Sequence, residues 1–135
     1  MTDDLEARYH AYLAVLNERR LDDLTHFVHE RLTYNDEEIT GRGYRDMIAA
    51  DIAAVPDLVF DPHLVVVSGD RVACRLVFRC TPRETFLGFT PDGGQVSFAE
   101  HVFYRFHEGR IAAVTSLIDR WSIATQLRDG ARPSR

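Results

Sequence analysis

The sequence contains no long apolar run and no run of positive charge, and each absence narrows the possible functions. No apolar segment approaches the roughly 20 residues that a membrane-spanning helix requires. The first residues, MTDDLEARYH, have neither the basic stretch nor the apolar stretch of a secretory signal. The formal net charge of −5 and the scattered arginines disfavour nucleic acid, whose binding demands clustered positive charge. We therefore expect neither a membrane nor a nucleic acid as a partner.

Cysteine is also scarce, with only Cys74 and Cys80 in the chain. Both fall in one expected strand, and a rise of about 3.3 Å per residue places their Cα atoms roughly 20 Å apart, far beyond disulfide reach. They share a face of that strand with Val72, Leu76 and Phe78. We expect two buried, reduced thiols, and hence a reducing, cytoplasmic compartment.

The composition that remains is that of one globular domain. The 135 residues are 45% hydrophobic and 27% charged, and two domains of half this length would each be too small to stabilise well. No internal repeat, low-complexity segment or linker interrupts the chain. We expect a single domain over residues 1–127 and a polar tail over residues 128–135.

Apolar residues recur at helical spacing in the first third of the chain. They predict a long helix from about Asp3 to Arg19 and a shorter one across residues 21–28. A brief extended stretch follows over residues 31–35. A third helix, capped by Thr40 and terminated by Pro56, would bury one stripe of side chains: Tyr44, Met47, Ile48 and Ile52.

From Leu58 onward the apolar period changes to two, which is typical of strands. Extended segments are expected at residues 58–67, 71–81, 84–89, 95–106 and 110–119, and a short helix at residues 121–127. Helices followed by an antiparallel sheet predict an α+β fold, in which the helices pack on one face of a curved sheet. A pocket should open between the helices and this sheet.

The tight Glu-Gly turn predicts the register of the last hairpin. With Phe106 opposite Ile111, regular pairing places Phe98 opposite Asp119, on the same face as Glu100. Directly opposed residues point to one face of a sheet, so one largely apolar face would carry both carboxylates. The mixed opposite face would meet solvent or a second subunit.

Two acids on an apolar face suggest proton transfer. An ionised carboxylate in apolar surroundings is costly unless it is paired, and both desolvation and the second charge would raise the pKa of at least one of them. A carboxylate tuned in this way can exchange a proton near neutral pH. The alternatives are structural: Asp119 could cap the helix that follows it, and Glu100 could pair with an arginine of a neighbouring strand.

The stretch FLGFTPDGGQVSFAEHVFYRFHEGRIAAVTSLIDRWSIATQL resembles the SnoaL-like polyketide cyclases, also called ester cyclases, of the nuclear-transport-factor-like superfamily. The segments TYNDEEITGRGYRDMI and RLVFRCTP match as well, so the likeness spans about Leu5 to Leu127. The resemblance implies a cone-shaped fold in which three N-terminal helices pack on a curved antiparallel sheet that encloses a pocket. It also implies a homodimer.

In the cyclases an aspartate at the end of the last strand is the acid/base, and Asp119 takes its place in the motif. The resemblance implies that Asp119, assisted by Glu100, takes a proton next to a carbonyl and returns it after cyclisation, with no cofactor or metal. The substrate would be a small apolar molecule that contains a carbonyl group.

The sequence departs from the cyclase pattern at three places in the last hairpin. Val102 occupies the position of a histidine that helps hold the substrate. Glu100 stands where the cyclases have a glutamine, and Thr115 where many relatives have a tryptophan. An aromatic polyketide is therefore not the expected substrate, and the fold transfers more safely than the activity.

Other residues are candidates to line the pocket, although aromatic residues at such spacing are more often part of a core. Asn35 matches a pocket asparagine of the cyclases but could equally serve a turn. His26 and His29 lie three apart, yet without a third ligand we expect no metal site. The candidate lining residues are Tyr12, Tyr34, Asn35, Phe86, Phe98, Val102, Tyr104, Thr115 and Trp121.

Three functions remain open at this point. The first is an enzyme that cyclises, isomerises or hydrates a carbonyl compound. The second is a non-catalytic module that binds a small apolar metabolite. The third is an interaction domain that dimerises through the mixed face of the sheet and has its interior filled by side chains.

Overall fold

A computed structural model describes residues 2–128 of the chain. The expected polar tail lies outside the described residues except for Arg128, the last residue of the final helix. In chain order the elements are α1 (Thr2–Asn17), the 3₁₀ helix η1 (Leu21–His26), β1 (Val28–Tyr34), β2 (Glu37–Thr40), α2 (Gly41–Ala54), β3 (Asp61–Ser68), β4 (Arg71–Cys80), β5 (Val96–His107), β6 (Arg110–Ile118) and α3 (Arg120–Arg128).

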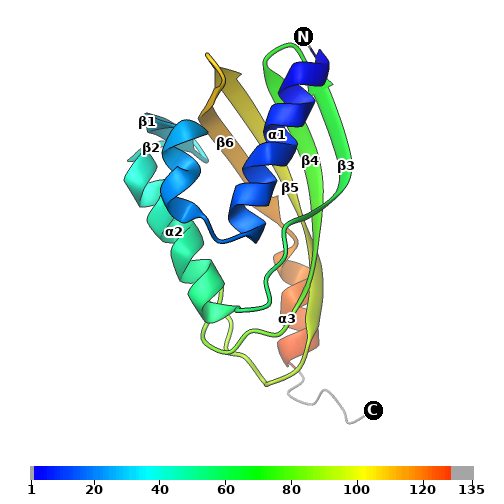
Figure 1. Cartoon of the computed structure of the whole chain (residues 1–135). Helices are drawn as coiled ribbons and strands as arrows, with labels where there is room; N and C mark the ends of the chain where they lie inside the picture. Colours follow the sequence, from blue (N-terminus) through cyan, green and yellow to red (C-terminus); the bar gives the residue numbers. More distant parts are fainter. Residues whose placement is uncertain (1, 129–135) are drawn as a thin grey trace.

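The strands form one curved six-stranded sheet in the order β2-β1-β6-β5-β4-β3. All neighbours are antiparallel except β1 and β6, which run parallel. In Figure 1, α1 and α2 cover one face of the sheet, and α3 lies at the far end beside β5. The α+β fold with helices on one face of a curved sheet is therefore confirmed, and the parallel β1–β6 pair is an addition to it.

Two expected elements and one expected core residue differ from the structure. The second helix is a single 3₁₀ segment, because the chain turns extended at Val28 to pair with β6. Residues 84–89 form no strand but a tight turn in which Phe86 and Phe89 exchange backbone hydrogen bonds. Positive φ angles at Leu87 and Gly88 reverse the chain there. Met47, expected in the buried stripe of α2, is 38% exposed.

The core lies between the helices and the inner face of the sheet. Alternate residues of β4 point into it, and Cys74 and Cys80 are buried free thiols, as expected. Aromatic rings of α1 pack on the same face, with the Tyr9 and Tyr104 ring centroids 5.0 Å apart. The inner face of the long strands is thus mostly apolar, and any polar side chain on it stands out.

Glycine allows α2 to begin close to β1. A Cβ atom at Gly41 would lie 2.6 Å from the backbone oxygen of His29, nearer than such atoms approach. Thr40 caps the helix, as predicted: its Oγ1 accepts the backbone N–H of Gly43 at 2.9 Å. Gly41 and Thr40 fix the position of α2, which carries Tyr44, a buried residue of the site described below.

A β-bulge in the last hairpin changes the expected register. Phe106 does face Ile111, but Arg105 faces Ala113, so Ala112 is an extra residue on β6. Every later residue of β6 is shifted by one position, and a shift of one reverses the face to which a side chain points. Glu100 consequently faces Ile118 instead of Leu117.

The bulge moves Thr115, Leu117 and Asp119 to the outer face of the sheet, where all three are exposed. The inner face of β6 carries Val114, Ser116 and Ile118 instead. The expectation that Glu100 and Asp119 share an apolar face is therefore wrong.

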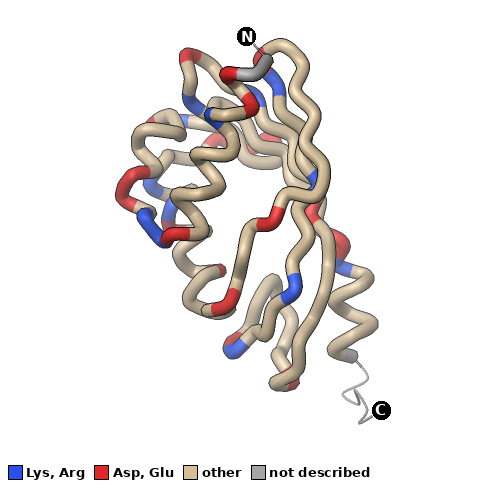
Figure 2. The backbone as a smooth tube through the Cα atoms, turned by 45° about the vertical axis from the view of Figure 1, so that its right-hand side comes forward, with Lys and Arg blue, Asp and Glu red and all other residues tan. Residues whose placement is uncertain are grey.

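The charged residues gather around η1, β1, β2 and the start of α2, while the middle of the long strands carries few of them (Figure 2). Within residues 2–128, no helix has the length and apolar character needed to cross a membrane.

Candidate functional site

Asp119 is the N-cap of α3. Its Oδ1 accepts the backbone N–H of Ser122 at 3.1 Å, and its Oδ2 accepts the Ser122 hydroxyl at 2.7 Å. These hydrogen bonds stabilise the ionised form and lower the pKa of the exposed carboxyl. The alternative role of Asp119, as the cap of the helix that follows it, is therefore confirmed. Two candidate lining residues lie nearby on the surface: Thr115 is exposed and Trp121 is 69% exposed.

Glu100 is the carboxylate that β5 does direct to the inner face. It lies between Leu76 of β4 and Ile118 of β6 and is only partly accessible to solvent. The hydroxyl of Ser116 donates a hydrogen bond to its Oε2. Burial raises the pKa of Glu100, the Ser116 hydrogen bond opposes this, and the charge of Asp51 raises it further. Glu100 is therefore a partly desolvated acid/base group.

Asn35 positions the residue that binds Glu100. It lies in the turn between β1 and β2 with a positive φ of 50°, a conformation that asparagine tolerates. Its Oδ1 accepts the backbone N–H of Ser116 at 2.7 Å, and its own N–H donates to the Val114 oxygen at 2.9 Å. The expected turn role is therefore observed, and the turn ties the β1–β2 hairpin to the strand that orients Glu100.

Four phenol groups lie near enough to Glu100 for its charge to raise their pKa: Tyr12, Tyr34, Tyr44 and Tyr104. The hydroxyls of Tyr12 and Tyr44 are 2.6 Å apart, and the rings of Tyr34 and Tyr44 have centroids 6.1 Å apart. Burial raises the pKa of Tyr12, Tyr44 and Tyr104, and the charge of Glu100 adds to the shift at each. These phenols stay protonated at neutral pH. Only one hydrogen of the Tyr12–Tyr44 pair is used between them, so the other remains a possible donor.

Asp51 is a second acid of this region that the sequence reading missed. It follows Tyr44 by seven residues and Ile48 by three, a spacing that places all three on one face of α2. Both neighbours on that face are buried. Burial raises the pKa of Asp51 to about 6. Within the described part of the chain its carboxyl makes no hydrogen bond or ion pair.

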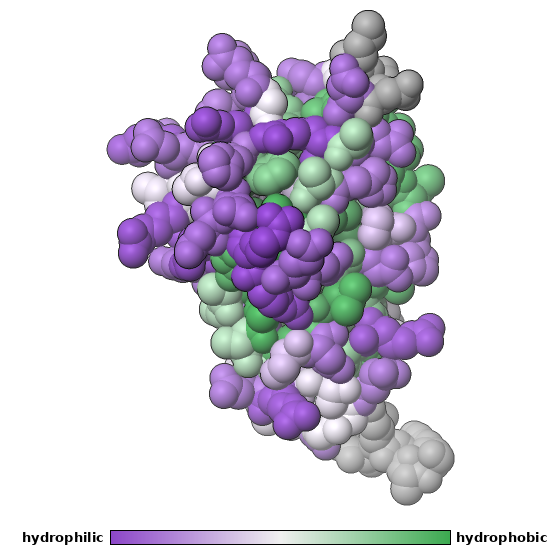
Figure 3. Space-filling view, viewed as in Figure 1, coloured by the Kyte–Doolittle hydropathy of each residue, from purple (hydrophilic) through white to green (hydrophobic). Residues whose placement is uncertain are grey.

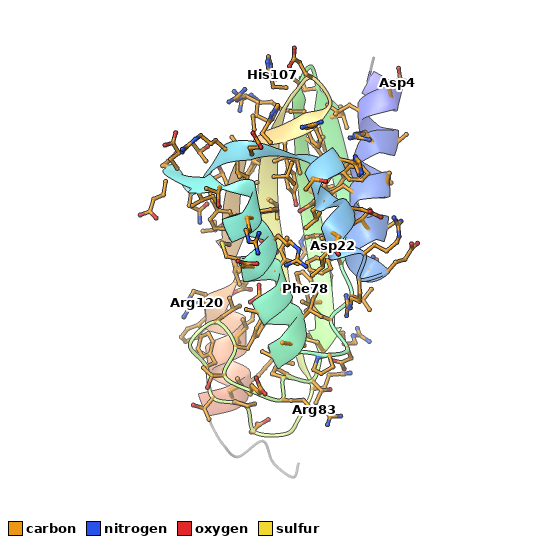
Figure 4. The ribbon with its side chains drawn as sticks, turned by 60° about the vertical axis from the view of Figure 1, so that its left-hand side comes forward. Asp4, Asp22, Phe78, Arg83, His107 and Arg120 are labelled. Carbon is orange, nitrogen blue, oxygen red and sulfur yellow. The ribbon has the colours of Figure 1, made fainter. Side chains whose placement is uncertain are left out.

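Phe86, Phe98 and Val102 belong to the apolar core instead of the polar cluster. Each is less than a tenth exposed. The Phe98 ring stacks on Phe78 at 5.0 Å and lies 6.0 Å from Phe86. Figure 4 labels Phe78 of β4, which lies beside α2 in that view. The structure thus brings Tyr12, Tyr34 and Tyr104 toward Glu100 and leaves the other lining candidates in the core or on the surface.

A separate groove of about 1170 Å³ opens on the helical side, where polar side chains cover η1, β1 and the start of α2 (Figure 3). Arginines from β1, α2 and β6 line this groove. They are far apart in the sequence, so the sequence does not reveal that they lie together. Asp22 binds the Arg45 guanidinium at 2.9 Å, and the acids of the groove are exposed. Its lining residues are Leu21, Asp22, Leu24, Thr25, His26, Val28, His29, Glu30, Arg31, Thr40, Gly41, Arg42, Arg45 and Arg110.

Neither Asp51 nor Glu100, the two carboxyls whose pKa burial raises, lines this groove. The groove does contain His26 and His29, the histidine pair for which no metal site was expected: His29 Nε2 lies 2.8 Å from the His107 oxygen, and the His26 oxygen accepts from Arg8. Among the residues that the structure describes, no His, Cys, Asp and Glu side chains are grouped to hold a metal ion.

Comparison with known proteins gives a consistent picture. The family model described as SnoaL-like polyketide cyclase matches residues 6–127. A SnoaL-like polyketide cyclase from Agrobacterium tumefaciens is 40% identical, covers 91% of this chain and 97% of its own, and superposes with a TM-score of 0.87. No curated protein matches the chain.

Two Streptomyces proteins share the fold at lower identity. TsrD from Streptomyces laurentii is 21% identical over 98% of both chains, with a TM-score of 0.83. IdmH from Streptomyces antibioticus is 20% identical over 92% of this chain and 98% of its own, with a TM-score of 0.80.

The capping role of Asp119 is testable by substitution. Asp119→Ala removes both acceptors of Ser122 and is expected to lower the melting temperature, whereas Asp119→Ser retains a capping oxygen and should lose less. Because folding lowers the pKa of Asp119, its contribution is present above the ordinary aspartate value of 3.8 and is lost as the pH falls through the lowered value. Thermal unfolding at pH 7 and pH 2 measures this. Equal melting temperatures for the wild type and the alanine variant at pH 7 would contradict the role.

Proposed function

The chain belongs to the SnoaL-like polyketide cyclase family, and from this membership we propose that it is a small-molecule enzyme in which Glu100 transfers a proton next to a carbonyl group. The observation that carries the proposal is the placement of Glu100: a carboxyl on the inner face, raised in pKa by burial and bordered by phenols. Such a group can take and return a proton near neutral pH. The assignment moves the main role from Asp119, which caps a helix, to the acid first expected to assist it.

The proposed reaction needs no added cofactor. Ionised Glu100 takes a proton from the carbon next to a carbonyl, and the electron pair moves to the carbonyl oxygen to form an enolate. The enolate carbon attacks a second carbonyl of the same molecule, which becomes an alkoxide. Protonated Glu100 then gives its proton to that alkoxide, so the product is an isomer of the substrate. Isomerisation or hydration would use the same group.

The phenols supply the second half of the chemistry. The hydroxyl hydrogen left free by the Tyr12–Tyr44 pair can donate to the carbonyl oxygen as negative charge develops on it. Hydrogen bonds placed in advance at such a position are often the largest catalytic contribution. A lysine imine, the other common way to activate a carbonyl, has no residue to form it because all 16 basic residues other than histidine are arginines.

The substrate we propose is a small apolar carbonyl compound, in keeping with the apolar residues that adjoin Glu100. Val102 is buried and offers no hydrogen bond at the position where the cyclases have histidine. A reducing, cytoplasmic compartment belongs to the same proposal, because Cys74 and Cys80 are free thiols. The second candidate is a module that binds the metabolite without turning it over.

Proton exchange into a simple ketone tests the function. In D₂O the wild-type protein should accelerate deuterium incorporation next to the carbonyl of 2-tetralone, followed by NMR. Glu100→Gln should reduce the protein-dependent rate by about 10²–10⁴-fold. Its fold should be retained, because the substitution removes a costly buried ionisable group. Asp119→Asn, which keeps a capping oxygen, is the matched control and should exchange like the wild type.

Two outcomes would contradict the assignment. Equal rates in the wild type and Glu100→Gln would exclude Glu100 as the proton-transfer group. Tight binding of the ketone with exchange no faster than in buffer would favour the binding module, and Glu100→Gln should then bind at least as well.

A homodimer through the outer face of the sheet is also part of the proposal. Four exposed apolar side chains lie there in two adjacent rows that cross β3–β6: Leu64, Val66, Phe103 and Leu117. Burying them against a second copy would remove this apolar surface from water. Light scattering should give twice the mass of one chain at micromolar concentration, and Phe103→Glu should give the monomer mass. A wild-type monomer under these conditions would contradict the dimer.

A further inference from the structure

We propose that the arginine-lined groove beside the start of α2 binds a phosphate monoester of a small apolar molecule, whose phosphate Arg42, Arg45 and Arg110 hold. Neither Glu100 nor any of the four phenols near it lines this groove. The inference therefore goes beyond the proposed function, and either one can be wrong without the other.

Direct contacts join the walls of the groove. Arg45 of α2 binds Asp22 of η1 at 2.9 Å. Arg110 is the first residue of β6, and the backbone N–H of Ile111 beside it donates to the Phe27 oxygen at 2.8 Å, between η1 and β1. The close approach of the first residue of α2 to β1 completes the arrangement. Guanidinium groups from α2 and β6 therefore enter one groove.

Positive charge exceeds negative charge along the groove. Four arginines line it but only two acids, Asp22 and Glu30, whereas the whole chain has a formal net charge of −5. Asp22 and Asp46, which pair with Arg45, are 93% and 63% exposed, and exposed ion pairs contribute little. An incoming anion can therefore compete for the Arg45 guanidinium. The groove is a positive region of an acidic protein, and such a region attracts anions.

Two of the arginines have guanidinium groups available for a ligand. Within residues 2–128, Arg42 and Arg110 form no ion pair and no side-chain hydrogen bond, and both are exposed. Arg31 differs, because its guanidinium lies 3.6 Å from the Glu38 carboxylate. Arg42 and Arg110 therefore supply the unpaired charge of the groove, and Arg45 lies beside them.

The arginines of α2 stand at the end of the helix where a cation is unfavourable. Arg42 and Arg45 are its second and fifth residues, and its first turn contains no acid. The N-terminus of a helix carries partial positive charge, which repels cations and attracts anions. Without a ligand the two guanidinium groups therefore destabilise the helix. A bound phosphate would interact favourably with the helix end and with the guanidinium groups.

The size and lining of the groove favour an organic phosphate over a bare ion. Its volume of about 1170 Å³ is that of a site for a small molecule. Leu21, Leu24 and Val28 add apolar side chains to the lining. A planar guanidinium binds two oxygens of one phosphate, and a phosphate monoester carries more negative charge at neutral pH than a carboxylate does. The ligand we infer therefore combines a phosphate with an apolar group.

Phenyl phosphate, followed by NMR of the ¹⁵N-labelled protein, tests the site. Binding should shift the side-chain N–H signals of Arg42, Arg45 and Arg110. The double variant Arg42→Gln/Arg110→Gln should bind at least tenfold more weakly, because it loses two charged donors. Arg83→Gln is the matched control and should bind like the wild type. Arg83 is exposed, and its backbone N–H binds the Ala54 oxygen at the opposite end of α2.

Inorganic phosphate and benzoate test the two parts of the ligand. Phenyl phosphate should bind more tightly than either, since only it offers both the dianion and the ring. Equal affinity for inorganic phosphate would overturn the organic ligand and leave an adventitious ion only. Tighter binding of benzoate would overturn the choice of phosphate. Equal binding of phenyl phosphate by the wild type and the double variant would overturn the site itself.

The melting temperature gives an independent reading. In phosphate-free buffer at low salt, Arg42→Gln should melt about 1–3 °C above the wild type, because it removes a cation from the positive end of α2. Millimolar phenyl phosphate should then stabilise the wild type more than Arg42→Gln/Arg110→Gln. A lower melting temperature for Arg42→Gln without ligand would contradict the unfavourable placement. Equal stabilisation of the two proteins by phenyl phosphate would contradict the binding site.

Discussion

The one extra residue in the β5–β6 hairpin determines which acid enters the interior. Ile111 and Val114 are both buried, although residues three apart on a regular strand point to opposite faces. Ala112 resolves this conflict by forming a bulge between Phe106 and Arg105 of the partner strand. Beyond the bulge Ser116 faces inward beside Glu100, and Asp119 faces outward. The chemistry of the inner face follows from this shift.

Hydrogen bonds to residues outside the β5–β6 hairpin stabilise the bulge. The Ile111 N–H donates to the Phe27 oxygen at 2.8 Å, which ties the start of β6 to the end of η1. Arg8 of α1 donates to the Gly109 oxygen at 2.9 Å, and its guanidinium lies 4.0 Å from the Phe27 ring. At the other end, Asn35 binds Ser116. The β1–β2 hairpin and α1 therefore fix a register that the hairpin's own turn does not determine.

The sequence predicted most of the architecture because local signals were strong. Thr40 marked the start of α2, and strict alternation marked β4. The last strand was oriented wrongly beyond Ala112, because the turn alone does not reveal a bulge and both alternating sets of residues 111–119 mix apolar and polar side chains. Asp51 was overlooked because Met47 and Ile52 completed an acceptable apolar stripe without it. Its spacing from Tyr44 and Ile48 was the available signal. The arginine-lined groove could not be foreseen, because its residues come from separate elements.

The account depends on the register of β5 against β6, and nuclear Overhauser contacts between their backbone protons measure it directly. The bulged register predicts contacts of Tyr104 with Val114 and of Val102 with Ser116. Contacts of Tyr104 with Ala113 and of Val102 with Thr115 would show a regular hairpin. That result would return Asp119 to the inner face and remove the basis for assigning the chemistry to Glu100.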